Sequence, residues 1–189
     1  MALLLVPMLM AACSSKKDVA PACPRVSVLG EAGTMTRFAP GPGRDILDID
    51  FEAEVADVSS ACRDHKRDGK PVSLVVLAPV LVASRGPANT DRQARFSYFV
   101  SVVDSAQQIL TKQIFPVTID FSGNRNRVAF RDDDPPITVD VPNPGGAGAR
   151  AYEILVGMQL TQDEIDYNRK RSTDGDVRGA LIPGSVPIQ

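Results

Sequence analysis

Carboxylate side chains gather in one alternating stretch of this chain, and their spacing limits the chemistry that they could do. Asp48, Asp50, Glu52 and Glu54 alternate with apolar residues, which places them on one face of an extended strand about 7 Å apart. This spacing does not match the close carboxylate pair of a retaining glycosidase, and no acid–base partner is evident. The alternatives are a solvated outer face paired with Arg or Lys across strands, a binding face for a basic partner, and a cation site.

A second acidic group and the single histidine give weaker signals. Asp132, Asp133 and Asp134 precede two prolines and could offer oxygen ligands to calcium, but the spaced ligands and the glycine of a calcium loop are missing. The alternative is a hydrophilic turn. His65 lies in the charged segment 63–69, which favours an exposed turn over a catalytic role.

The usual catalytic and phosphate-binding patterns do not occur in the sequence. There is no Gly-x-Ser-x-Gly elbow, and the glycines of segment 145–148 lack the Lys-Ser/Thr ending of a phosphate loop and precede an expected strand. The lone His65 does not complete a metal site with the cysteines. We therefore predict a protein that is not an enzyme and holds no metal or cofactor.

Two of the three cysteines are placed to form a disulfide. Cys23 precedes the first expected strand and Cys62 follows the second. If these strands pair in antiparallel fashion, the start of one lies beside the end of the other, which brings the two sulfur atoms close together. The alternatives are two free buried thiols or half of a metal site.

The third cysteine ends an apolar leader. Residues 2–12 are apolar, and Leu9-Met10-Ala11-Ala12-Cys13 is followed at once by Ser14-Ser15-Lys16-Lys17. As a helix the run rises about 16 Å, which is too short for a hydrocarbon core of about 30 Å but has the length of a signal-peptide core. The Ala-Ala-Cys ending resembles the lipobox of bacterial lipoproteins.

That resemblance implies that Cys13 is lipidated on sulfur, becomes the first residue after cleavage and is acylated on its amine. Ser14, rather than Asp, after the cysteine implies an outer-membrane anchor that faces the periplasm. Met10 departs from the usual Leu, and no basic residue precedes the leader, which an upstream start codon would explain. The alternative is a frayed apolar N-terminus on a cytosolic protein whose cysteine is incidental.

Beyond the leader, composition and periodicity predict an all-β domain. The chain has 15 Pro, 14 Gly and no Trp, and its formal net charge of −2 gives no electrostatic reason to expect nucleic-acid binding. Residues 31–44 have the composition of a loop. Expected strands occupy residues 25–29, 47–55, 72–83, 95–103, 108–115, 117–121, 127–130, 137–141 and 151–160.

Short strands at regular spacing predict a single antiparallel β-sandwich with one short C-terminal helix. Tyr152, after a Gly-rich loop and shortly before Leu155-Val156, resembles the late-strand tyrosine of immunoglobulin-like and fibronectin type III domains. Thr161 and Glu164 form a capping box, and Arg169 to Arg171 close the helix, where they could also contact anionic lipid or an acidic partner.

The expected organisation is a signal peptide over residues 1–12, a tether over 13–22, a sandwich domain with its helix over 23–171 and a disordered tail over 172–189. The opening of the mature chain resembles small alphaproteobacterial lipoproteins. We predict a lipid-anchored, non-catalytic interaction or structural module of the cell envelope, whose partners are membrane lipid and another envelope protein. The alternative is a small-ligand-binding or metal-binding periplasmic lipoprotein.

Overall fold

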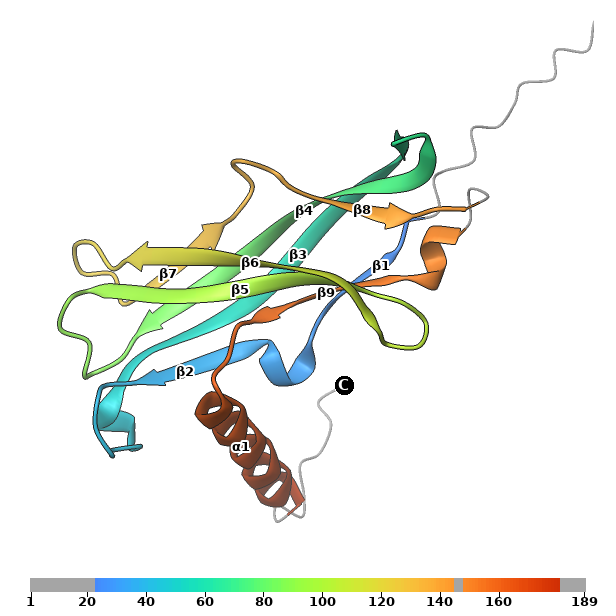
Figure 1. The fold of residues 1–189 in the computed structure, drawn as a ribbon. Helices are drawn as coiled ribbons and strands as arrows, with labels where there is room; N and C mark the ends of the chain where they lie inside the picture. Colours follow the sequence, from blue (N-terminus) through green and yellow to red (C-terminus); the bar gives the residue numbers. More distant parts are fainter. Residues whose placement is uncertain (1–22, 145–147, 181–189) are drawn as a thin grey trace, which may run out of the picture.

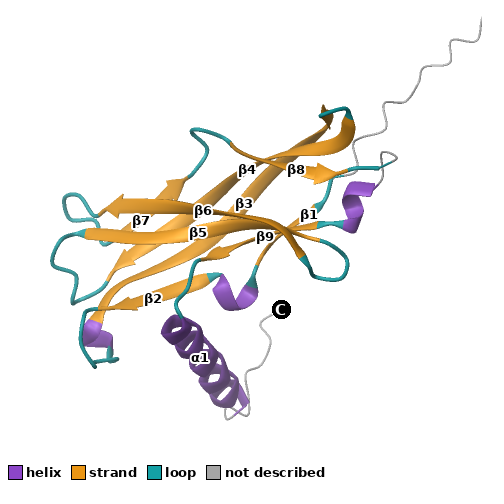
Figure 2. Cartoon of the chain, viewed as in Figure 1, coloured by secondary structure: helices purple, strands orange, loops and turns teal. Residues whose placement is uncertain are grey.

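The computed structural model describes residues 23–144 and 148–180, and Figures 1 and 2 show its elements. The strands are β1 (Arg25–Val28), β2 (Thr34–Phe38), β3 (Ile49–Arg67), β4 (Lys70–Arg85), β5 (Gln93–Val103), β6 (Ile109–Asp120), β7 (Arg127–Arg131), β8 (Ile137–Pro142) and β9 (Glu153–Met158). The helices are η1 (Gly30–Ala32), η2 (Ile46–Asp48), η3 (Gly148–Ala151) and α1 (Gln162–Ala180). The predicted leader, Cys13 and the tether lie outside the described residues.

Two sheets face each other in a sandwich-like arrangement (Figure 2). One has the order β1-β9-β5-β6, and the other has the order β2-β3-β4-β7, with β8 also pairing with β4. The prediction of a mostly β fold with a C-terminal helix is confirmed. The prediction of purely antiparallel pairing is wrong, because β1 runs parallel to β9. Parallel neighbours need a long connection, which the rest of the domain provides here.

Alternation along β3 separates the core from the outer surface. Phe51, Ala53 and Val55 are buried between the sheets, whereas Glu52 and Glu54 lie on the opposite face. The facing sheet contributes inward residues of β5 in the same period of two. The largest fully buried side chains are Tyr98, Phe121, Met35, Leu77, Leu81, Ile154 and Met158.

The strand predicted over residues 47–55 begins two residues later, at Ile49, because Leu47 and Asp48 belong to η2, and it extends much further, to Arg67. Its ladder with β4 shifts register between Val55 and Asp57, where the alternation of apolar and polar residues also slips. Beyond that bulge β3 is largely polar on both faces, so no period-2 signal marks it. Asp68 and Gly69 form the two-residue turn to β4 with φ values of 50° and 76°, a conformation that favours glycine and aspartate.

Two prolines lie inside strands without ending them. Pro79 is in β4, at the point where the neighbour of β4 changes from β8 to β7, so its missing N–H leaves no gap in the ladder. Pro116 was expected to break the strand, but β6 continues through it to Asp120. The reason is that Pro116 lies on an edge strand, which pairs with β5 alone among the described residues.

The segment 31–44, predicted to be a loop, contains the edge strand β2. Gly33 precedes the strand, and Pro40, Gly41 and Gly43 follow it. These residues give the whole segment the composition of a loop, although a strand lies inside it. Met35 is buried in the core, and its register opposite Ala53 fixes β2 beside β3.

Helix α1 begins with the predicted capping box. The side chain of Glu164 accepts from the Thr161 backbone N–H at 2.8 Å, and the Glu164 N–H donates to Thr161 Oγ1 at 3.4 Å. The helix was expected to end at Arg171 but continues to Ala180. Within the described residues, no helix combines the length and the apolar character needed to cross a bilayer.

The predicted disulfide is present and joins Cys23 to Cys62, with a Cα–Cα distance of 5.8 Å and a sequence separation of 39. The arrangement that led to this prediction is wrong, because β1 and β3 do not pair. Instead β1 belongs to the four-stranded sheet and β3 to the other, so the bond crosses from one sheet to the other.

We predict that replacing Cys62 by Ser lowers the free energy of unfolding by about 4 kcal/mol, because the bond closes a loop of 39 residues. Urea unfolding of the oxidised parent and the variant measures this difference, and mass mapping without reductant should recover the bridged peptide pair. As a control, a reducing agent should lower the stability of the parent but not that of Cys62→Ser. Free thiols at both positions in the unreduced protein would contradict the assignment.

Candidate functional site

The four predicted acidic residues do not form a row of free carboxylates. Asp48 belongs to η2, where its Oδ2 accepts from the Asp45 backbone N–H at 3.0 Å. Asp50 accepts from Nδ2 of the buried Asn89 at 2.8 Å. Both carboxylates therefore hold local structure together at the start of β3.

The other two carboxylates are paired with arginines on the outer face of the sheet. Glu52 Oε1 lies 3.1 Å from Arg171 of α1, and Glu54 Oε1 lies 2.7 Å from Arg127 of β7. These exposed pairs reduce the net charge of the face and contribute little stability individually. A basic partner would have to compete with both arginines.

The Asp132 to Asp134 segment is also occupied by internal contacts. Asp132 accepts from the Tyr98 hydroxyl at 2.5 Å, and Asp133 pairs with Arg131 at 3.0 Å. Burial, together with the hydrogen bond to Asp132, raises the pKa of Tyr98 above its usual value, so the phenol stays a neutral donor. His65 is exposed on β3, and among the described residues no cluster of His, Cys, Asp and Glu is arranged to hold a metal ion.

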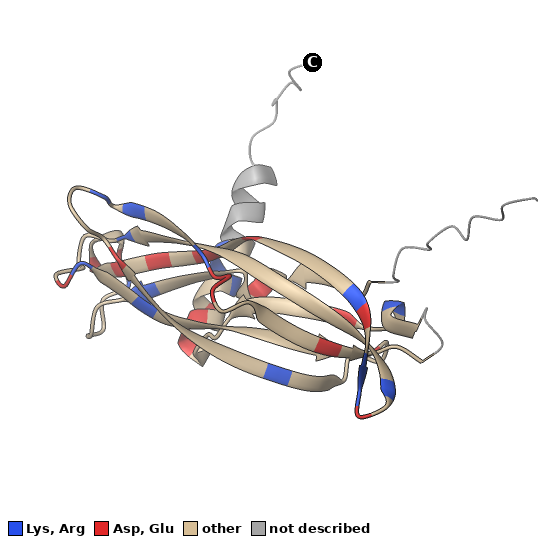
Figure 3. Cartoon of the chain, turned by 90° about the horizontal axis from the view of Figure 1, so that it is seen from above, with Lys and Arg blue, Asp and Glu red and all other residues tan. Residues whose placement is uncertain are grey.

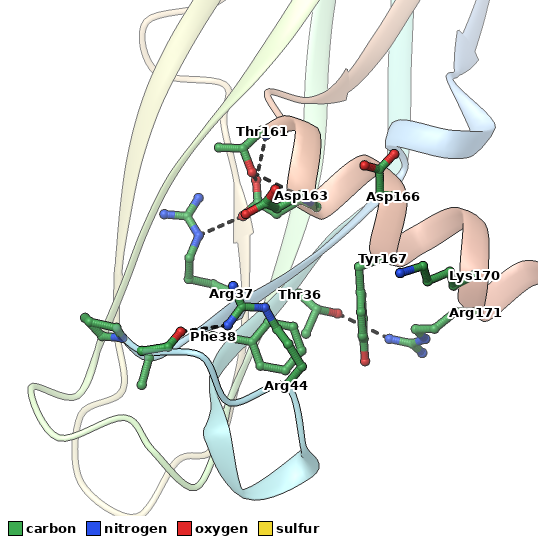
Figure 4. A pocket seen from close by; sticks show the side chains of 14 residues that line it. Thr36, Arg37, Phe38, Arg44, Thr161, Asp163, Asp166, Tyr167, Lys170 and Arg171 are labelled. Atoms are coloured by element: carbon green, nitrogen blue, oxygen red, sulfur yellow. Dashed lines mark hydrogen bonds and ion pairs between the residues drawn. The ribbon is translucent and has the colours of Figure 1, made fainter.

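Helix α1 and strand β2 enclose a groove of about 820 Å³ (Figure 4). Its aromatic wall is formed by Phe38 and Tyr167, whose ring centroids lie 5.0 Å apart edge to face. The guanidinium of Arg44 lies 5.3 Å from the Phe38 ring, and that of Arg171 lies 5.8 Å from the Tyr167 ring. The groove therefore combines aromatic and cationic surface.

Most of the charges in this helix–strand groove already have partners. Arg37 donates to Glu164 at 2.7 Å, and Arg171 contacts both Thr36 and Glu52. Glu164 is buried, with an exposed fraction of 7%, so this pair fixes the start of the helix against β2. Lys170 lines the groove without an ion pair among the described residues.

The helix also protects the edge of β2. The side chain of Asn168 donates to the backbone carbonyls of Thr34 and Glu31 at 2.9 and 3.1 Å. Thr34 lies on the edge strand of its sheet, so this contact occupies a carbonyl that another strand could use.

The edge strand β6 of the other sheet is open over its first half. Ile109, Leu110 and Ile114 have exposed fractions of 64%, 50% and 54%. Among the described residues β6 pairs with β5 alone.

The hydrogen-bond pattern identifies the β6 residues that direct their backbone groups to the open side. The N–H of Gln159, just after β9, donates to the carbonyl of Ser97 in β5 at 2.8 Å. The backbone N–H and C=O of Ser97 therefore point toward β9 and away from β6. Since backbone direction alternates along a strand, the next residue, Tyr98, bonds to its β6 partner Phe115. Ile114, the neighbour of Phe115, therefore directs its N–H and C=O outward, and Lys112 does the same.

A shallow apolar groove of about 390 Å³ adjoins this open edge on the outer face of the sheet. Phe99 forms its floor, and its ring lies over Gly157, where an added Cβ would come within 3.0 Å of the ring. The ammonium of Lys112 lies 4.3 Å from the centroid of the Phe99 ring. Ile109 lines the same groove, so exposed apolar surface and a free backbone edge are contiguous here.

The sequence reasoning missed both the helix–strand groove and the open β6 edge. A strand over residues 108–115 was expected, but periodicity cannot show which strands are edges. The apolar Ile109-Leu110 pair next to the charged and polar 111–113 segment was the only local signal of exposed apolar surface.

Comparison with known proteins finds no match: no family model fits the chain, and no curated protein or solved structure is significantly similar to it. The two surfaces are therefore interpreted from their own geometry.

We predict that Glu164→Ala lowers the free energy of unfolding by about 2 kcal/mol, because it removes charge-assisted hydrogen bonds from Arg37 and Thr161 in a buried position. The matched control is Asp163→Ala, which removes an exposed carboxylate from the same helical turn. Urea unfolding followed by circular dichroism measures both changes. An equal, small effect of the two substitutions would show that the Arg37–Glu164 pair does not hold α1 in place.

Proposed function

We propose that this protein is a lipid-anchored, non-catalytic interaction module of the cell envelope, and that it binds an extended segment of another envelope protein along β6. One observation carries the proposal: the first half of β6 has exposed apolar side chains and a free backbone edge together. An added strand uses both features, since its backbone pairs with the edge and its side chains cover the apolar groups.

The limits of the exposed edge support a short, specific contact. Pro116 has no N–H and, opposite Ser97, lies at an outward-facing position, so an added strand cannot continue pairing past it. The turn between β5 and β6 ends the edge on the other side. Lys112 faces outward between these limits and discourages a second copy of the chain from pairing there, because two copies would bring like charges together.

The anchoring part of the proposal rests on the leader and on the disulfide. The Ala-Ala-Cys13 ending resembles a lipobox, and a Cys23–Cys62 disulfide is typical of proteins in oxidising compartments. An acylated Cys13 would hold the domain at the outer membrane on its periplasmic side. Several acyl chains are needed for stable anchoring. The immunoglobulin-like assignment based on Tyr152 likewise stays a prediction.

Small-ligand binding is the second candidate function, and the groove between α1 and β2 favours it. The groove has the volume of a small-molecule site and carries Arg44 and Lys170 beside two aromatic rings. An anionic ligand with a flat apolar part would fit this chemistry. It ranks second because Arg37 and Arg171, the other cations in the groove, are already paired with carboxylates.

We predict that Ile114→Pro reduces recovery of the β6 partner about ten-fold, which corresponds to about 1.4 kcal/mol. The substitution removes an outward N–H and apolar surface without breaking a hydrogen bond to β5. Crosslinking in intact envelopes, followed by purification, measures recovery. The control is Ile46→Thr, which removes apolar surface from another exposed isoleucine, in η2.

Recovery should stay at the parent level for Ile46→Thr, and Ile114→Thr should give an intermediate loss because it keeps the N–H. Thermal unfolding of each variant checks that the fold persists. Unchanged recovery with a folded Ile114→Pro variant would exclude β6 as the contact.

We predict that the parent protein incorporates a clickable fatty acid and that Cys13→Ser does not. The thiol is the acceptor of the lipid, and the lipoprotein peptidase cleaves before a modified cysteine, so the variant should also persist as the longer precursor. In-gel fluorescence and mass determination measure both effects. Equal labelling of parent and variant would exclude anchoring through Cys13.

A further inference from the structure

The turn of the β3–β4 hairpin lies at the end of the sandwich where the described chain begins. Cys23 precedes β1 and is bonded to Cys62, five residues before the end of β3 at Arg67. Figure 1 shows β1 starting at the same end of the domain as the turn between β3 and β4. Residues 63–70 are all exposed, so this hairpin end projects into its surroundings instead of packing on the core.

Basic side chains outnumber carboxylates in this hairpin end. Arg63, Lys66, Arg67 and Lys70 carry positive charge, and Figure 3 shows charged residues of both signs around the turn. The positive charge of Arg67 is offset by a salt bridge to Asp140 at 2.6 Å. Of the others, none has an ion pair among the described residues, so three cations are available to an external anion.

The two carboxylates of the hairpin end reduce its positive charge only in part. Asp64 accepts a hydrogen bond from Asn143 at 3.0 Å, which directs it toward β8 and the body of the domain. Asp68 lies in the turn itself. The remaining positive charge is modest, so by itself it gives weak binding to an anionic surface, which would add to the attachment that an anchor provides.

The position of the disulfide sets how close this hairpin end comes to an anchor at Cys13. The connection from Cys13 to Cys23 reaches at most about 35 Å. Cys62 lies about 20 Å from the turn along the strand. The turn is therefore within reach of the surface that would hold an acylated Cys13.

We propose that Arg63, Lys66 and Lys70 form a membrane-facing contact that binds the anionic headgroups of phospholipids. The inference rests on the anchoring part of the proposed function, because the anchor is what brings these cations to the bilayer. Each Lys or Arg near an anionic surface strengthens attachment about five-fold. The contact would orient the domain on the membrane, with the disulfide as the rigid link between the tether and the hairpin.

Lipid fits this surface better than nucleic acid does. Nucleic-acid binders concentrate many cations along one face, whereas the chain as a whole has a formal net charge of −2. A few cations next to a lipid attachment site are the usual second signal that supports an acyl chain.

The test uses the predicted mature chain, residues 13–189, with Cys13→Ala so that no acyl chain contributes. We expect it to co-sediment with vesicles containing phosphatidylglycerol but not with phosphatidylcholine vesicles, and to be released as salt shortens the screening length. The double variant Lys66→Glu and Lys70→Glu should lower the affinity at least twenty-five-fold, five-fold for each cation lost. The matched control, Arg95→Glu with Arg125→Glu, makes the same change in net charge at exposed positions away from the hairpin and should retain the parent affinity.

Three results would overturn the inference: no preference for phosphatidylglycerol, equal losses in the two double variants, or unchanged binding by the hairpin variant. The last of these would place the binding outside the hairpin end. All three leave anchoring intact, because fatty-acid labelling at Cys13 is measured separately. Conversely, a chain that is unlabelled in cells but binds these vesicles through the hairpin would contradict the anchor and not the lipid contact.

Discussion

The Cys23–Cys62 disulfide joins the two sheets at the end of the domain where β1 begins, and the positions of several other elements depend on it. β1 has only four residues and, within the part of the chain that the structure describes, pairs with β9 alone. So short a strand is weakly held by its own ladder. The bond ties the start of β1 to β3, the longest strand of the opposite sheet, and thereby fixes both the entry of the chain and the base of the β3–β4 hairpin.

The edge of β2 is covered and the first half of the β6 edge is open, and this difference locates the candidate contact. The edge of β2 is covered by α1, through Asn168 at the backbone and the buried Arg37–Glu164 pair at the start of the helix. The far part of β6 is interrupted by Pro116. In the first half of β6, where apolar side chains are exposed, Lys112 is the charged side chain that discourages pairing with another edge strand. An unprotected, apolar edge is a liability for a soluble domain, so a bound partner is a physical reason for its presence.

The fold could be predicted from the sequence wherever local pattern and packing agreed. Strict alternation in residues 47–55 identified the core strand β3, and the Thr161–Glu164 pair identified the start of α1. The pattern failed where tertiary contacts determine the secondary structure. The segment β2 is a strand because Met35 packs in the core, although the residues on both sides of β2 have the composition of a loop. Pro116 does not end β6 because its missing N–H lies on the open side of an edge strand, and a single sequence does not show which strands are edges.

The candidate surfaces were harder to predict than the fold, for a related reason. The acidic alternation at Asp48 to Glu54 is plain in the sequence, but its partners Arg127 and Arg171 come from distant segments, and only the folded chain brings them together. The disulfide was predicted correctly from an incorrect strand pairing. Two cysteines near strand ends can meet across a sandwich as well as within a sheet, and the count of cysteines does not distinguish the two.

The strand register places the β6 edge and the basic hairpin end at the same end of the molecule. Val103 of β5 lies opposite Glu153 of β9, and Glu153 lies beside Arg25 of β1, two residues after Cys23. Ile109 pairs with Val103, so the open half of β6 begins at the same end of this sheet, three strands away from β1. If the anchor and the hairpin hold this end against the bilayer, a partner on β6 is bound near the membrane surface. On the proposed function, β6 would then bind an extended segment that comes close to the lipid headgroups.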